Sequence, residues 1–136
     1  MTGVQTCALP ILSKVIKDGE VAVLYSPGYG AGWSTWNHEY TPEILFDPVL
    51  VDLAEQNEKL FWEKHGDENY YEDYFIVPEI EEKMVKHCAE KYPEAYLGGI
   101  GDLAVKWLPV GTEFRIHEYD GNESVEVQKE MHWYIA

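Results

Sequence analysis

Three closely spaced glycines follow a β-prone run near the N-terminus, in the sequence Gly28-Tyr29-Gly30-Ala31-Gly32. Glycines at this spacing let backbone N–H groups approach an anion or a flat ring without a Cβ atom in the way. The spacing does not match a dinucleotide-binding fingerprint, and the loop lacks the lysine of a P-loop. Two interpretations remain, a shaped binding loop or tight turns around buried tryptophans.

Aromatic residues are dense around this loop. They are Tyr25, Tyr29, Trp33, Trp36 and Tyr40. Each ring offers a face on which a base can stack, and such a contact contributes about 1–3 kcal/mol. The amide of Asn37 can hydrogen-bond the edge of a base. The alternative is that Trp33 and Trp36 belong to the core.

Arg115 is the only arginine in the chain and lies in the β-prone sequence FRIHEY. Its planar guanidinium suits bidentate contacts to phosphate or carboxylate, and Lys106 on a neighbouring predicted strand would assist it. Strand alternation places Arg115, His117 and Tyr119 on one face. The alternative role for Arg115 is a structural salt bridge.

A second glycine cluster at residues 98–102 precedes another predicted strand. The two glycine loops and the Arg115 strand are therefore predicted as walls of one pocket, although the sequence does not show that they meet. The predicted ligand-binding residues are Tyr25, Gly28, Tyr29, Gly30, Gly32, Trp33, Trp36, Asn37, Gly99, Lys106, Arg115 and His117.

Metal and nucleophile chemistry have little support in the sequence. The five histidines and Cys88 lack metal-ligand spacing, and no serine lies in a G-x-S-x-G elbow. We therefore expect no metal, no cofactor and no catalytic residue. A small nucleotide hydrolase that uses His117 or His38 as a base stays open as an alternative.

The chain carries a net charge of −15, which argues against binding to DNA, RNA or an anionic membrane. Residues 38–94 carry −11 of this charge, whereas residues 13–37 are neutral. A small anionic ligand near the first glycine loop is therefore compatible with the composition. The acidic segment at residues 67–74 supports another alternative, an inhibitor that docks on a basic host protein.

The elements that position these residues follow from local patterns. The β-prone runs are residues 14–17, 21–25, 103–108, 112–119, 124–127 and 132–135, with a short extended piece at residues 43–46. Asp18-Gly19 predicts a hairpin between the first two runs. Helices are predicted from Pro48 to about Lys64, and from Pro78 to a point before Pro93.

This order predicts a single α+β domain over residues 13–136, with an antiparallel sheet packed against about two helices. The sheet would contain the N-terminal hairpin and the C-terminal strands. No apolar run approaches the ~18–20 residues of a membrane span, so we expect a soluble, cytoplasmic protein with Cys7 and Cys88 as free thiols.

Residues 1–11, MTGVQTCALPI, resemble a translated sequencing adapter. Residues 1–12 are therefore expected to be an artefact or a disordered terminus. The remaining chain, with VAVLYSPGYGAGWSTWN, LFDPVLV, GTEFRIHEYDGNESV and WYIA, resembles a family of small uncharacterised proteins of phage genomes and viral metagenomes. That family has no catalytic motif to carry over.

The resemblance implies a phage origin and, by analogy, a role against host defence. Small phage proteins called sponges sequester cyclic oligonucleotide or cyclic ADP-ribose signals in pockets between subunits. We therefore expect a non-enzymatic homo-oligomer that captures a small anionic nucleotide-type ligand in the cytoplasm of an infected bacterial host. This is an analogy of size, origin and pocket chemistry.

Overall fold

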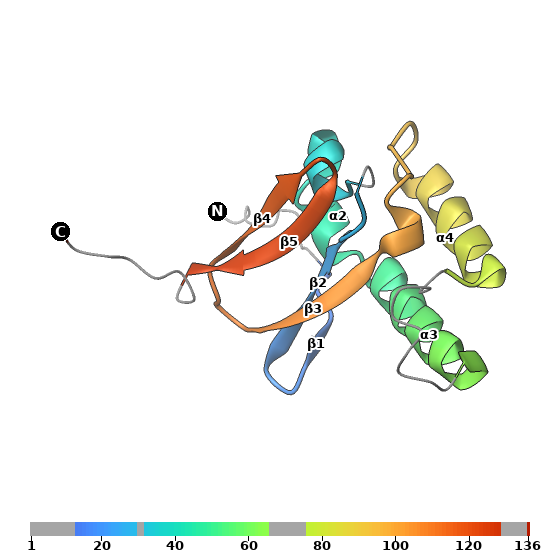
Figure 1. The fold of residues 1–136 in the computed structure, drawn as a ribbon, viewed down its shortest axis with the longest axis horizontal. Coiled ribbons are helices and arrows are strands. Elements are labelled where there is room, and N and C mark those ends of the chain that lie inside the picture. The colour runs from blue at the N-terminus through green and yellow to red at the C-terminus, as the bar shows by residue number, and fades with distance from the viewer. Residues whose placement is uncertain (1–12, 30–31, 66–75, 129–135) are drawn as a thin grey trace, which may run out of the picture.

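The computed structural model describes residues 13–29, 32–65, 76–128 and 136 (Figure 1). Its strands are β1 (Ile16–Lys17), β2 (Glu20–Tyr25), β3 (Ala104–Pro109), β4 (Phe114–Tyr119) and β5 (Asn122–Val127). Its helices are α2 (Glu43–Phe46), α3 (Pro48–His65) and α4 (Pro78–Lys91), with 3-10 turns η1 (Ser34–Trp36), η2 (His38–Tyr40) and η4 (Ile100–Asp102). These elements confirm the predicted α+β class.

The N-terminal hairpin forms at Asp18-Gly19, as predicted. Both residues have a positive φ, 52° and 78°, which is the conformation that a tight two-residue hairpin turn requires at its centre. Lys17 lies opposite Glu20 and closes the turn. The Asp-Gly pair therefore fixes the register of β1 and β2.

The strands belong to two antiparallel sheets. β3 follows the helices in sequence but pairs with β2, which gives the order β1-β2-β3 with Val21 opposite Leu108. β4 and β5 form a separate hairpin in which Phe114 lies opposite Val127. The strands after the helices therefore divide between the two sheets instead of extending one.

Side-chain alternation along β2 builds a core on each face of the three-stranded sheet. Leu24 packs with residues of α3 and α4 such as Leu50 and Met84. Val23 points to the other face and belongs to a second core with Val127 of β5. Figure 1 shows α3 and α4 on one side of the sheet and the β4–β5 hairpin on the other.

Helix α3 begins at Pro48, as predicted, and Asp47 caps it. Asp47 Oδ1 accepts hydrogen bonds from the backbone nitrogens of Val49, at 2.9 Å, and Leu50, at 3.1 Å. Pro48 occupies the first helical position, where a missing N–H group costs nothing. The second predicted helix, α4, also begins at its proline, Pro78.

The extended piece expected at residues 43–46 is wrong, because these residues form helix α2. The backbone nitrogen of Leu45 donates to the carbonyl oxygen of Pro42 at 3.0 Å. Ile44 is buried in the core with α3 and α4, whereas Leu45 and Phe46 are buried in the second core. A helical turn distributes three consecutive apolar side chains between the two cores, which strand alternation would not allow.

Several predicted features lie outside the described residues. They are the terminal segment of residues 1–12, Gly30, the acidic segment at residues 67–74 and the strand at residues 132–135. Within the described parts of the chain, no helix has the length and apolar character needed to cross a membrane.

Candidate functional site

The two glycine-containing loops meet in the structure. Ser26 Oγ, at the start of the first loop, donates a hydrogen bond to the carbonyl oxygen of Gly99 in the second at 3.0 Å. Gly28 lies directly against Asp102, because a Cβ atom at Gly28 would be 2.1 Å from Asp102 Oδ2. The two loops can approach this closely because Gly28 has no side chain.

A cleft of about 570 Å³ lies beside this contact. It is lined by the end of β2 and the following loop (Tyr25, Pro27, Gly28), by one face of α3, and by residues 102–105. The face of α3 carries Ala54, Glu58 and Trp62, which lie on one side of the helix because they are four residues apart. The volume is in the range of ~300–1,000 Å³ that is typical of small-molecule sites.

The charged groups of the cleft are carboxylates. Glu58 and Asp102 supply them, and the described lining contains no lysine, arginine or histidine. Burial, together with the negative charge of Glu58, raises the pKa of Tyr25 above its ordinary value. The phenol therefore stays protonated at neutral pH and can donate a hydrogen bond. The cleft combines the rings of Tyr25 and Trp62 with two anionic acceptors.

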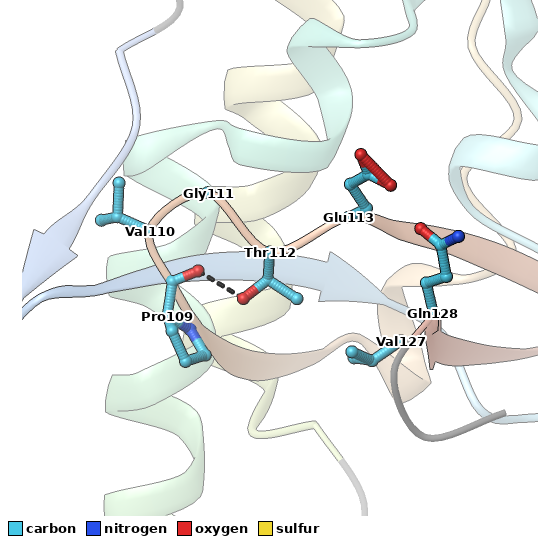
Figure 2. A pocket seen from close by; sticks show the side chains of 7 residues that line it. All are labelled: Pro109, Val110, Gly111, Thr112, Glu113, Val127 and Gln128. Atoms are coloured by element: carbon cyan, nitrogen blue, oxygen red, sulfur yellow. Dashed lines mark hydrogen bonds between the residues drawn. The ribbon is translucent and has the colours of Figure 1, made fainter.

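A second pocket, of about 420 Å³, lies where β3 turns into β4 (Figure 2). Figure 2 shows Thr112 facing back toward Pro109, and Thr112 Oγ1 donates a hydrogen bond to the Pro109 carbonyl oxygen at 2.6 Å. Val127 and Gln128 at the end of β5 complete the pocket. Among its described lining residues there is no aromatic side chain and none of the predicted ligand-binding residues. The cleft beside Gly28 is therefore the better candidate.

Trp33 is a core residue. Its side chain is fully buried, and indole Nε1 donates a hydrogen bond to the carbonyl oxygen of Ile44 at 3.0 Å. The core interpretation that the sequence left open is the one that the structure shows. Because the ring has no exposed face, it cannot act as a stacking platform in this conformation.

Trp36 is 39% exposed and packs beside the first glycine loop. A Cβ atom at Gly32 would be 2.5 Å from the indole ring, so this glycine permits the contact. The ring centroids of Trp36 and Tyr96 are 4.9 Å apart. Tyr29 is still more exposed than Trp36, and neither residue is part of the cleft lining.

The side chain of Asn37 forms hydrogen bonds with the backbone of Trp33 and of Tyr96. Its Oδ1 accepts a hydrogen bond from the Tyr96 nitrogen at 2.7 Å, and its Nδ2 donates to the carbonyl oxygens of Trp33 and Tyr96 at 2.9 and 3.0 Å. The side chain is buried, and both amide hydrogens have protein acceptors. Asn37 is therefore engaged in joining the first loop to the segment before the second.

Arg115 forms the salt bridge that the sequence left as an alternative. Its Nε lies 2.7 Å from Oε1 of Glu126, the residue opposite it on β5. The predicted common face of Arg115, His117 and Tyr119 is confirmed, because all three are exposed on the side of the hairpin that faces away from the core. This face is separate from the cleft lining.

Lys106 lies on β3 opposite Val23. Its strand neighbours Val105 and Trp107 pack against the core formed with α3 and α4, so Lys106 belongs to the other face of the sheet. Neither Lys106 nor Arg115 lines the cleft. The structure thus brings the two glycine loops together but does not place the two cations with them.

Glu123, which holds the first loop, is not among the residues predicted from the sequence. It is fully buried and accepts hydrogen bonds from the backbone nitrogens of Ser26 (3.0 Å), Trp33 (2.8 Å) and Thr35 (3.0 Å), and from Thr35 Oγ1 (2.5 Å). The backbone amides on either side of the predicted Gly28–Gly32 loop therefore donate to a carboxylate of the chain itself. The available signal was alternation, since Glu123 shares the inward face of β5 with Val127.

A second buried carboxylate, Asp47, joins the start of α3 to the end of α4. Its Oδ2 accepts a hydrogen bond from the Tyr92 hydroxyl at 2.5 Å and lies 2.8 Å from His87 Nε2 and 3.3 Å from Lys91 Nζ. Burial and the charge of Asp47 raise the pKa of the neighbouring Cys88 thiol to about 12. This thiol is therefore protonated at neutral pH and is not an activated nucleophile.

Comparison of the chain with protein-family models, with curated proteins and with solved structures finds no match. The described residues also contain no group of three or more His, Cys, Asp or Glu side chains placed to hold a metal ion. The homo-oligomeric state and the phage origin therefore stay predictions.

Proposed function

We propose that this protein is a non-enzymatic binding protein that sequesters a nucleotide-derived small molecule and holds it through its nucleoside part. The cleft beside Gly28 would be the binding site. The observation that carries the proposal is the meeting of the two glycine loops over a cleft that has aromatic rings and carboxylates in its lining. Capture of an immune signal in an infected bacterium belongs to the same proposal.

The chemistry of the lining fits a nucleoside. The Trp62 indole and the Tyr25 phenol offer ring surfaces for a base, and each stacked contact contributes about 1–3 kcal/mol. Glu58 and Asp102 can accept hydrogen bonds from ribose hydroxyls, the role that an acidic residue has in dinucleotide-binding domains. The protonated Tyr25 hydroxyl adds a donor for a ring nitrogen or carbonyl oxygen.

The same carboxylates change the expected role of phosphate. A phosphate group inside the cleft would face the negative charges of Glu58 and Asp102, and no cation in the described lining would offset them. Phosphates of the ligand must therefore point toward solvent. The proposal gives Arg115 and Lys106 no part in neutralising them within the cleft.

Isothermal titration calorimetry tests this assignment with adenosine, guanosine, their monophosphates and cyclic ADP-ribose. We expect at least one nucleoside to bind, and its monophosphate to bind more weakly because of the two carboxylates. Glu58→Gln should weaken nucleoside binding about tenfold, since a hydrogen bond to a charged acceptor contributes about 1.5–3 kcal/mol. The ligand should be recovered unchanged.

Glu63→Gln is the matched control, because Glu63 is exposed on the same helix and is not part of the cleft lining. Its affinity should equal that of the wild type. No binding of any of these ligands, or equal losses in Glu58→Gln and Glu63→Gln, would contradict the proposal. Turnover of the ligand would contradict its non-enzymatic part.

A further inference from the structure

The Glu123 carboxylate spans the two ends of the first glycine loop. One oxygen, Oε1, accepts from the nitrogen of Ser26 where the loop begins, and the other, Oε2, accepts from Trp33 and Thr35 where it ends. The backbone nitrogen of Glu123 also donates to the Ser26 carbonyl oxygen at 2.8 Å. Side chain and backbone of one β5 residue therefore hold both ends of the loop.

A buried carboxylate is costly unless donors surround it. Glu123 is 1% exposed, and three backbone N–H groups and one hydroxyl donate to it. Converging backbone amides of this kind form an anion-binding concavity. Here the anion is the Glu123 side chain itself. The shape of the loop therefore depends on the carboxylate, and the buried carboxylate depends on the loop for its hydrogen-bond donors.

The loop between these anchors carries Pro27 and Gly28, which line the cleft. The absence of a Cβ atom at Gly28 permits its close approach to Asp102, and the position of the loop determines whether the two residues meet. We propose that Glu123 is the positioning residue of the cleft, an internal anion that holds Ser26 on one side of the loop and Trp33 and Thr35 on the other, and so keeps Gly28 against Asp102. Its effect on ligand affinity rests on the proposed function, whereas its effect on the loop is independent of any ligand.

Amide hydrogen exchange measured by NMR tests the loop directly, without ligand. In Glu123→Gln, an amide NH₂ group replaces one acceptor oxygen and faces the same donors. We expect the Trp33 and Thr35 amides to exchange at least about tenfold faster than in the wild type, relative to buried amides of β2. The control is Glu126→Gln, which changes a partly exposed glutamate of the same strand that does not contact the loop amides, and it should leave both rates unchanged.

Wild-type exchange rates in Glu123→Gln would overturn the proposal. If this variant does not fold, Thr35→Val removes one donor to the carboxylate and keeps the backbone amide. The Trp33 amide should then exchange faster, by a smaller factor than in Glu123→Gln, and an unchanged rate would overturn the proposal equally.

Titration with the nucleoside that binds the wild type supplies the second readout. Glu123→Gln should weaken its binding at least about tenfold while Glu126→Gln binds normally. If the wild type binds no nucleoside, the proposed function fails, and the exchange rates still decide the role of Glu123. Equal affinities in Glu123→Gln and the wild type would contradict the link between this residue and the cleft.

Discussion

Gly28 and Asp102 lie so close that a Cβ atom added at Gly28 would be 2.1 Å from Asp102 Oδ2 and 2.6 Å from Asp102 Cγ. Residue 28 follows β2 and residue 102 precedes β3, so the contact lies in the lining of the candidate cleft, where β2 ends and its partner β3 begins. A side chain at residue 28 would displace one of the two carboxylates that give the cleft its charge.

Gly28→Ala should therefore abolish or strongly weaken ligand binding while it changes the unfolding free energy little. The Asp102 carboxylate must move away from residue 28, and the side chain is short enough that this movement alters its position in the cleft. Calorimetry with the nucleoside that binds the wild type, together with urea denaturation, measures the two effects.

Gly101→Ala is the control for this substitution, because a Cβ atom at Gly101 would have no atom within 4 Å. Its affinity should match the wild type. The steric origin is tested by adding Asp102→Ala to Gly28→Ala, since the added methyl group should cost nothing further once the carboxylate is absent. Wild-type affinity in Gly28→Ala would show that the contact does not shape the site.

Gly32→Ala should move the Trp36 indole away from its present position. The nearest ring atoms would be 2.5 and 2.6 Å from the new methyl group, and the half-exposed ring can rotate toward solvent. We expect the unfolding free energy to fall by about 1 kcal/mol. We also expect the NOE cross-peaks between the Trp36 and Tyr96 rings to disappear. Ring contacts that persist in this variant would contradict the packing described for residue 32.

Asp47→Ala should destabilise the protein by about 2–4 kcal/mol, as measured by urea denaturation. The substitution removes the cap of α3 and leaves the buried Tyr92 hydroxyl without its acceptor. Asp52→Ala on the exposed face of the same helix should change the unfolding free energy by less than about 0.5 kcal/mol. Similar losses in both variants would rule out a special role for the Asp47 network.

Asp47 also makes stability depend on pH. Burial alone would raise its pKa, but hydrogen bonds from Tyr92, His87 and Leu50 hold the pKa below its ordinary value of 3.8. Because the folded-state pKa is lowered, the stabilisation is complete above about pH 4–5 and is lost as the pH falls through the folded-state value. The difference in unfolding free energy between wild type and Asp47→Asn should therefore be constant near neutral pH and shrink below about pH 4. If the difference in unfolding free energy between the two proteins is the same in stronger acid as at neutral pH, the lowered pKa of Asp47 is contradicted.

Local patterns were sufficient to predict much of the fold. The Asp18-Gly19 turn, the helix start at Asp47-Pro48 and the common face of Arg115 and His117 each depend on residues close in sequence. The helix at residues 43–46 was missed because three consecutive apolar residues have no period. Their burial depends on two cores that only the tertiary structure creates.

The candidate site was predicted less completely. The sequence identified both glycine loops and Tyr25, but Glu58 and Trp62 join them only because α3 packs beside the ends of β2 and β3. Glu123 was not predicted, because its partners lie 88 to 97 positions earlier in the chain. Arg115 was selected as a rare cation, although its partner Glu126 is a simple cross-strand neighbour.

Chemical-shift mapping by NMR during a nucleoside titration tests the central claim most directly. We predict the largest changes at the backbone amides of Tyr25, Gly28 and Asp102 and at the Trp62 indole N–H, with Arg115 and His117 unaffected. The absence of shifts with every nucleoside tested, or shifts confined to the Arg115 face of the β4–β5 hairpin, would contradict the assignment of the cleft as the binding site.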